Sequence, residues 1–488
     1  MSSVSKINFF FKFLFLLILI TGCTENKTTG TRQLVLLDSK QEEDIGAKEH
    51  PKIIKTFGGV YGSKELKNYV SKIGKNLANI SEMPNLKWKF TILDSPLVNA
   101  FALPGGYVYI SRGLLSLAND EAELANVLGH EIAHVTSRHA AQRHAKETLS
   151  EIGLSILDIV IGQPIISNVA NLGRHGVLAA FSRSEEMEAD EIGRRYALQA
   201  GYDPYASSRF LNRLNDLSKL SDEQNKNLMN SIFSTHPRTL DRVEKASEIS
   251  TNNDKKTKTN RNYYLAAINN IDYGESSKNG IIKNNKFLHL HLDIAFSVPK
   301  SFKIENRKDA VIARNVNKES ILIFDGISGE RDLTLIEIVE SIIGRSRAEL
   351  IKNLKIYDRD AVIIKDNKLV FFEDIKYSRT FVLIRWIDSQ IWRFTILVNP
   401  NSNESVYNEL ENEVINFHSL SESEKKLAQP KKIKIHVSEE RETLLSLSKK
   451  MSLDKDKMEW LKIINGFSKD LQDNYQLQPG TLVKLIVE

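Results

Sequence analysis

His130-Glu131-Ile132-Ala133-His134 is the most informative stretch of this 488-residue sequence. It lies within residues 120–146, which are rich in strong helix formers and carry Ala, Leu and Val at core spacing. On a helix, positions i and i+4 lie about 40° apart around the axis, so both imidazoles project from one face and can bind one Zn²⁺ ion. Glu131 is turned about 100° from His130 and can reach a water on the metal as a general base. The alternative is a solvated helix face with two histidines, so a third ligand is needed.

A second helical stretch downstream offers that third ligand. Residues 181–193 (FSRSEEMEADEIG) place Glu186 and Asp190 four positions apart, on one face of a helix. Two carboxylates on one face repel each other unless a cation lies between them or one of them orients a ligand. Glu186 would bind the metal, and Asp190 would accept the outer N–H of a metal-bound histidine and fix its tautomer. The alternative interpretation is a solvated acidic face.

Four segments in fixed order resemble the gluzincin zinc metallopeptidases of the HtpX, BepA and CAAX-prenyl-protease type, metallopeptidase family 48. Besides the two stretches above, residues 99–110 (NAFALPGGYVYI) resemble that family's NAFxxPGG strand. Residues 234–242 (STHPRTLDR) resemble its THPxxxxR segment, and Gly201-Tyr202-Asp203-Pro204 is also typical. The resemblance covers roughly residues 38–250.

The resemblance implies a mainly α, zincin-type peptidase domain with a small edge-strand sheet and one Zn²⁺ per chain. Such a zinc ion activates water and polarises the scissile carbonyl. The residues that match the family's zinc ligands are His130, His134 and Glu186, with Glu131 as the general base and Asp190 as the outer partner of a ligand.

Two further features of the site follow from the same resemblance. His236 is a candidate catalytic residue with two roles left open, since it either stabilises the oxyanion or occupies the fourth zinc position in a latent state; a solvated loop histidine is the alternative. An extended peptide would add by β-augmentation to an edge strand. The strand and its turn are represented by Asn99, Ala100, Phe101, Gly105 and Gly106.

Other charged residues receive smaller roles. His139 lies five residues after His134, about 140° around a continuous helix, so we expect it to be structural or exposed and outside the zinc site. The alternation of His289 and His291 favours a β-sheet over a metal site. We expect Arg183 and Arg242 to pair with the acidic helix, one of them being a candidate for substrate contact.

The single cysteine, Cys23, marks the end of a secretory signal. It allows no disulfide, so any metal site must use His and carboxylate ligands. The apolar run 13–20 is too short to span a bilayer, which needs about 20 residues. Ile20-Thr21-Gly22-Cys23 resembles the bacterial lipobox, which implies cleavage before Cys23 and its acylation. An uncleaved anchor and ordinary secretion are the alternatives. Thr24 in place of Asp favours, by resemblance to Gram-negative sorting rules, the periplasmic face of the outer membrane over the inner membrane.

The composition is that of a multidomain globular protein. Hydrophobic residues make up 41% and charged residues 26%, with a net charge of +5. These values exclude collagen-like, wholly disordered and polytopic membrane proteins and give no support to nucleic-acid binding. The expected order is signal peptide 1–22, tether 23–37, peptidase domain 38–250, linker 251–279, α+β domain 280–420, linker 421–432 and a small domain 433–488.

The α+β domain and the segment 152–181 remain without an assigned chemistry. The domain shows strand-type runs and two helical stretches, near 333–345 and 405–418, and is interpreted as a substrate- or partner-binding module. The apolar segment 152–181 is interpreted as a hairpin or lid over the active site, with shallow membrane contact and ordinary core as alternatives. The predicted strands are 310–314, 320–324, 361–365, 369–372, 380–387 and 392–398.

Residues 433–488 resemble a βααβ LysM module. The order is a strand, helices near 442–450 and 456–464, Asn465-Gly466, Leu477-Gln478-Pro479-Gly480 and a closing strand. Such modules bind N-acetylglucosamine-containing glycans, so peptidoglycan is a candidate partner. Glu440-Arg441-Glu442-Thr443 stands where the family usually has GDT, which leaves a pure docking role as the alternative.

The sequence therefore predicts a membrane-tethered periplasmic zinc endopeptidase. Its expected substrates are misfolded or stalled envelope and outer-membrane proteins, by resemblance to BepA-type proteins. Those relatives carry tetratricopeptide repeats and this chain shows none, so substrate selection must differ. The alternatives are a chaperone or assembly factor for outer-membrane proteins with a latent zinc site, and a peptidoglycan-associated scaffold.

Overall fold

The computed structural model describes residues 23–145, 180–220, 232, 236, 242, 257–307, 309–328, 333–387 and 390–488. They form two compact units, of which the first combines the described residues up to Gly274 with Lys431–Glu488 and the second is Glu275–Pro430. The signal peptide 1–22 and residues 152–179 of the expected lid lie outside the described residues. Among the helices that are described, none combines the length and the apolar composition needed to cross a bilayer.

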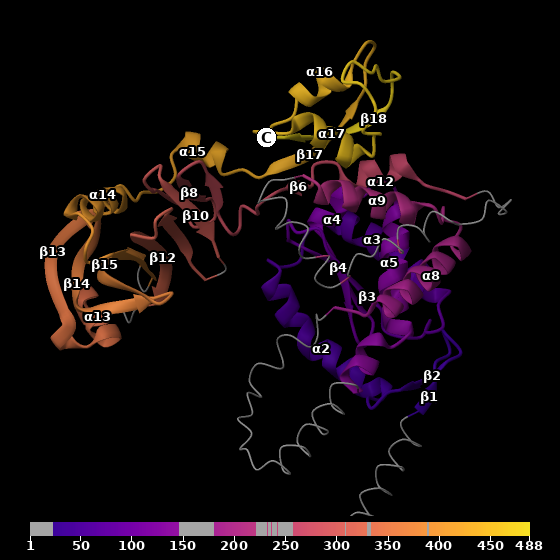
Figure 1. Ribbon diagram of the computed structural model, residues 1–488, viewed down its shortest axis with the longest axis horizontal. Coiled ribbons are helices and arrows are strands. Elements are labelled where there is room, and N and C mark those ends of the chain that lie inside the picture. Colours follow the sequence, from indigo (N-terminus) through magenta and orange to yellow (C-terminus); the bar gives the residue numbers. More distant parts are fainter. Residues whose placement is uncertain are drawn as a thin grey trace, which may run out of the picture. The chain divides into compact units, whose positions relative to one another are not determined.

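The first unit is built mainly from helices packed around one core (Figure 1). Their apolar residues recur three and four positions apart, as in Lys64–Asn79, where Leu66, Val70, Ile73 and Leu77 are buried. The helices are α2 (Ser39–Thr56), α3 (Lys64–Asn79), α4 (Arg112–Leu117), α5 (Glu121–Thr136), α8 (Arg183–Gln199), α9 (Ala206–Ser218) and α12 (Arg261–Ile268).

A three-stranded sheet adjoins α5, with the order β3-β5-β4. Strand β5 (Tyr107–Ser111) runs parallel to β3 (Lys89–Leu93) and antiparallel to β4 (Ala100–Leu103), so β4 is the edge strand. The turn after β4 needs glycine, because Gly105 and Gly106 have φ values of +81° and +86°. A Cβ atom on Gly105 would also lie 2.7 Å from the Glu43 Cα atom.

The region that composition predicts to be a tether is folded against the end of α5. Strands β1 (Cys23–Glu25) and β2 (Arg32–Leu34) pair in an antiparallel hairpin. The Asn26 side-chain amide donates to the Ser137 carbonyl at 2.9 Å, and the Thr28 hydroxyl donates to the Thr136 carbonyl at 3.1 Å. These bonds satisfy carbonyl groups that a helix end leaves without partners inside the helix.

The C-terminal segment shares the core of the helical unit. Its strand–helix–helix–strand order agrees with the sequence prediction: β17 (Lys431–Val437), α16 (Leu444–Lys449), α17 (Lys457–Asn465) and β18 (Leu482–Val487). Strand β17 pairs with both β18 and β6 (Asp272–Tyr273). Residues of this segment, including Ile433, Leu461 and Ile486, belong to the same buried cluster as α3, α5 and α9.

Lys484 fixes this segment to the end of α4. Its ammonium group is fully buried and donates to the carbonyls of Ser116, Leu117 and Ala118 at 2.8, 3.2 and 2.8 Å. Burial lowers the pKa of Lys484 well below its ordinary value. The three carbonyls lie at the C-terminal end of a helix, where a cation is favoured.

The second unit is an α+β structure around a seven-stranded antiparallel sheet of order β10-β11-β12-β16-β15-β14-β13. Alternate residues of β15 face opposite sides: Phe381 and Leu383 pack with α13, while Val382 and Ile384 belong to the cluster that contains α14. The sheet and its helices are β10 (Phe302–Asn306), β11 (Val311–Asn315), β12 (Ser320–Ser328), β13 (Ala348–Ile356), β14 (Arg359–Phe372), β15 (Ile375–Ile387), β16 (Gln390–Val398), α13 (Leu335–Ile343), α14 (Glu404–Ile415) and α15 (Glu422–Leu427).

The predicted strands and helices of this unit are confirmed, with one difference. The runs 361–365 and 369–372 belong to a single strand, β14, whose register shifts between Asp366 and Val370. At the shift, buried Asp366 accepts hydrogen bonds from Arg347 at 2.6 Å and Arg379 at 2.5 Å. Both expected linkers contain regular structure: 251–279 contains α12 and β6, and 421–432 contains α15 and the first residues of β17. A smaller sheet consists of β7 (Ile281–Lys283), β8 (Lys286–His289) and β9 (Ile294–Ser297). His289 lies in a strand as expected, whereas His291 lies in the turn that follows it.

Candidate metal centre

Helix α5 carries the His-Glu-x-x-His stretch into the interior of the first unit. Asp120 begins the helix, because its side chain accepts a hydrogen bond from the backbone N–H of Glu123 at 2.8 Å. Glu131 and His134 are buried, with 2% and 3% of their surface exposed. The Nε2 atoms of His130 and His134 lie 3.0 Å apart, as expected for ring nitrogens that share one helix face.

Helix α8 brings the acidic residues against α5 through a close contact of two glycines. A Cβ atom on Gly129 would lie 2.7 Å from the Gly193 carbonyl oxygen, and one on Gly193 would lie 2.6 Å from the His130 backbone nitrogen. Only residues without a side chain allow the two helices to approach this closely. The contact lies one residue from His130, so it holds Glu186 within reach of both histidines.

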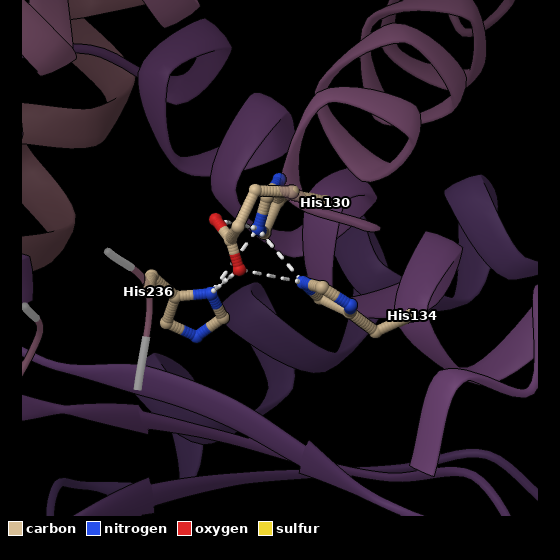
Figure 2. A group of neighbouring side chains, drawn as sticks. His130, His134 and His236 are labelled. Carbon is tan, nitrogen blue, oxygen red and sulfur yellow. Dashed lines mark hydrogen bonds and ion pairs between the residues drawn. The ribbon is translucent and has the colours of Figure 1, made fainter. Parts of the chain in front are cut away.

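Four buried side chains converge at one point: His130, His134, Glu186 and His236 each place a potential ligand atom within 4.8 Å of the others. The carboxylate oxygens of Glu186 lie 3.5 Å from His134 Nε2 and 3.6 Å from His130 Nε2. His236 Nδ1 lies 2.9 Å from Glu186 Oε1 and 3.3 Å from His130 Nε2. Figure 2 shows the three labelled histidine rings directed toward a common centre.

The hydrogen bonds around this group fit a bound cation. Asp190 Oδ1 lies 2.9 Å from His130 Nδ1, and a carboxylate only accepts hydrogen bonds. His130 therefore carries its proton on Nδ1, which leaves a lone pair on Nε2 facing the centre. Two nitrogen ligands of a tetrahedral zinc ion are roughly 3.4 Å apart, close to the 3.0 and 3.3 Å found here. Histidines with a single carboxylate are ligands that suit zinc.

Arg242 neutralises the two carboxylates of α8. Its guanidinium lies 2.6 Å from Glu186 and 2.7 Å from Asp190, which confirms the predicted pairing of this arginine with the acidic helix. Burial alone would raise the pKa of Asp190, but Arg242 and the hydrogen bond to His130 hold it well below its usual range. Both carboxylates are therefore ionised, as a ligand and an orienting acceptor must be.

Burial and neighbouring charges set the protonation of the remaining groups. Burial lowers the pKa of His134 well below its ordinary value, so its imidazole is neutral and able to bind a metal. Burial raises the pKa of Glu131, with the charge of His236 opposing it. Burial would lower the pKa of His236, but the carboxylates of Glu131 and Glu186 raise it above its ordinary value. A buried carboxylate with a raised pKa is better suited to take up and release a proton than an exposed one.

His139 lies outside the metal cluster as predicted, but its predicted 140° separation from His134 is wrong. The side chain is fully buried, and its Nδ1 atom lies 2.8 Å from His134 Nδ1. The expected 140° separation assumes one continuous helix, whereas α5 ends at Thr136 and Arg138 has a φ of +56°. The turn brings His139 back beside His134, although His139 is outside the group of four potential ligands. The contact of Phe181 with the site was also not predicted. Its ring stacks on the His134 ring, with the two ring centroids 3.8 Å apart.

The edge strand β4 runs between two cavities next to the cluster. One cavity is bounded by Ala100, His130 and Glu131, and its apolar wall consists of Val127, Phe210, Leu211, Leu214 and Ile232. The other adjoins Ala102, Leu103 and Pro104 together with His134 and Phe181. Phe101, between them, is buried against Tyr109 with ring centroids 4.9 Å apart. A peptide paired with β4 would therefore pass the four converging side chains.

This part of the chain is similar to known proteins. Residues 64–250 match the family described as Peptidase family M48. The mitochondrial metalloendopeptidase OMA1 of Schizosaccharomyces pombe is 34% identical over 182 residues, which are 37% of this chain and 52% of that protein. The beta-barrel assembly-enhancing protease of Yersinia pestis is 32% identical over 35% of this chain and 36% of its own length. The protease of the same name from Escherichia coli O157:H7 is 28% identical over 44% of this chain and 45% of its own length.

The relatives are matched over only part of their own length. The matched region spans about half the length of the first of these relatives, and less of the others. Among solved structures, the cyanobacterial PsbP protein of Synechocystis is similar over 30% of this chain and 98% of its own, at 15% identity and a TM-score of 0.23.

Proposed function

We propose that this chain, whose residues 64–250 form a peptidase family M48 domain, is a zinc-dependent endopeptidase that cleaves unfolded or stalled proteins of the cell envelope. The observation that carries the proposal is the convergence of His130, His134 and Glu186 beside Glu131 and the edge strand β4. The relatives named metalloendopeptidase and beta-barrel assembly-enhancing protease support the same reaction.

His130, His134 and Glu186 would hold the zinc ion. When bound, zinc supplies a Lewis acid that activates water and polarises the scissile carbonyl. Glu131 is placed to accept a proton from water and deliver it to the leaving amine, because it is buried beside the cluster and its Oε2 atom has no hydrogen-bond partner among the described residues. His236 lies close enough to cap the site or to donate a hydrogen bond to the oxyanion, and both roles remain open.

The edge strand favours extended, unfolded segments as substrates. Strand β4 has one neighbour, β5, so its other side can pair with a substrate backbone in extended conformation. Backbone pairing is insensitive to sequence, and the two flanking cavities accept side chains on either side of the cluster. A folded barrel offers no free extended segment of this kind, whereas a misfolded or stalled one does.

The direct test is cleavage of an outer-membrane porin by the purified chain of residues 24–488, which lacks the signal peptide and Cys23, in the presence of zinc. We expect the denatured porin to be cut and the folded porin to remain intact, as followed by gel electrophoresis and mass spectrometry of the fragments. A chain that prevents porin aggregation without cutting it would favour the alternative of a chaperone with a latent zinc site.

Acylation of Cys23 is proposed as the anchor to the periplasmic face of the outer membrane. Strand β1 begins at this residue and its hairpin bonds to the end of α5, so the lipid would lie close to the helix that carries the histidines. Stable anchoring needs several acyl chains, and Cys23→Ser removes the thiol that is acylated. We therefore expect this variant to move from the membrane pellet to the soluble periplasmic fraction. Unchanged retention in the pellet would contradict the lipoprotein interpretation.

The LysM-like segment is proposed to dock on the peptidase rather than to act alone. Its residues share the core of the first unit. In the loop that departs from the usual GDT, the Glu442 carboxylate pairs with His436 at 2.7 Å and Lys450 at 2.5 Å, so this side chain already has partners within the segment. Binding to peptidoglycan stays a prediction.

A further inference from the structure

The outer ring nitrogen of His134 meets a second histidine instead of a carboxylate. His134 Nδ1 lies 2.8 Å from His139 Nδ1, and His139 Nε2 lies 2.8 Å from Glu188 Oε2. His139 is fully buried, whereas the Glu188 side chain, on α8, is 35% exposed. Two consecutive hydrogen bonds therefore connect a residue of the metal cluster to a carboxylate near the surface.

The carboxylate determines the direction of both hydrogen bonds. A carboxylate accepts and cannot donate, so His139 must donate through its Nε2–H group. In its neutral form the His139 imidazole has only one N–H, so His139 Nδ1 accepts and His134 donates through Nδ1–H. The lone pair of His134 is then on Nε2, which faces His130 Nε2 at 3.0 Å and Glu186 Oε1 at 3.5 Å.

We propose that His139 and Glu188 are positioning residues that set the tautomer and the ring orientation of His134 for metal binding. The proposal rests on the zinc centre of the proposed function and adds two residues to it. Asp190 contacts His130 directly, whereas His134 is reached through an intervening imidazole. Phe181 stacks on the His134 ring at an interplanar angle of 15° and restricts its rotation.

The local fold explains how His139 reaches this position. After α5, Arg138 adopts a φ of +56°, and its guanidinium is held by Glu42 at 3.1 Å and by the Leu37 carbonyl at 2.6 Å. The chain therefore reverses before residues 139–145 resume a helical conformation. On α8, Glu188 lies two positions after Glu186, about 200° around the helix, so it faces away from the ligand cluster.

The test measures metal binding in the full mature chain, without any proteolysis. Zinc affinity is obtained by competition with a chromophoric chelator, and the visible spectrum of the Co²⁺-substituted protein reports on the ligand field. We expect Glu188→Ala and His139→Leu to weaken zinc binding by about 10–100-fold and to shift the cobalt bands. His139→Gln, whose amide can accept and donate, should recover part of the loss. Glu191→Ala, an exposed position on the same helix, is the matched control and should bind zinc as the wild type does.

Thermal unfolding of the metal-free variants separates positioning from folding. Because the Glu188 side chain is partly exposed, we expect metal-free Glu188→Ala to unfold near the wild-type temperature. Zinc affinity within twofold of wild type together with an unchanged cobalt spectrum in Glu188→Ala would overturn the proposal, whatever the behaviour of His139→Leu. A wild-type chain that binds zinc but cleaves no protein would contradict the proposed function and leave this assignment standing.

Discussion

Replacing Glu131 by Gln is expected to lower kcat/KM for denatured porin by roughly 10²–10⁴-fold while the chain still binds one zinc ion. The amide has nearly the shape of the carboxylate but cannot accept the proton of the attacking water. Glu131 is also 2% exposed and absent from the group of potential ligands, so the substitution leaves metal binding intact. The measurement is fragment formation under single-turnover conditions, together with the zinc content of both proteins.

The control for this variant is Glu191→Gln, which makes the same chemical change at an exposed position of α8. We expect it to cleave at the wild-type rate. Equal rates for the wild type and Glu131→Gln would show that this residue is not the base. Loss of zinc together with activity in Glu131→Gln would instead show that Glu131 supports the metal centre.

Removing the C-terminal segment Lys431–Glu488 is expected to abolish folding of the peptidase. Removing the whole second unit, Glu275–Pro430, is expected to leave the peptidase folded. A chain that ends at Pro430 lacks β17, α16, α17 and β18 and exposes the core packed against them. Each buried aliphatic side chain contributes roughly 1.5–3 kcal/mol. Ile433, Leu444, Leu447, Leu461, Val483 and Ile486 are all completely buried. The free energy lost with these six side chains is comparable to the whole free energy of unfolding of a domain, about 5–15 kcal/mol.

Excision of Glu275–Pro430 leaves this core complete. Tyr273 and Lys431 are paired neighbours in an antiparallel sheet, so a turn of about three residues is long enough to join them. We expect the excised protein to be soluble, to unfold cooperatively and to cleave denatured porin, and the chain ending at Pro430 to aggregate. A soluble, active chain without residues 431–488 would contradict the shared core.

The pairs of residues on α5 and α8 could be predicted from the sequence because they depend on helical periodicity, whereas His236 was placed by the resemblance of residues 234–242. His130 and His134, and Glu186 and Asp190, are each four residues apart, and the structure places each pair on one side of its helix. His139 could not be predicted in the same way, because Arg138 interrupts the helix with a positive φ that arginine adopts only when other contacts enforce it.

The relation of residues 431–488 to the peptidase could not be predicted either. Strand β17 pairs with β6 across an insertion of more than 150 residues, Glu275–Pro430. No local pattern in either strand indicates such a distant partner. The burial of Lys484 could not be predicted from the sequence either, because lysine is usually exposed. Its partners are backbone carbonyls at the end of α4, which no side-chain pattern reveals.

We propose that zinc held by His130, His134 and Glu186 makes this chain a peptidase. The most direct measurement is titration of the metal-free mature chain with zinc while cleavage of denatured porin is followed. We predict no cleavage without metal, a linear rise with added zinc and a plateau at one equivalent per chain. Cleavage that persists after complete metal removal, or a chain that takes up one zinc ion and leaves every unfolded substrate intact, would contradict the claim.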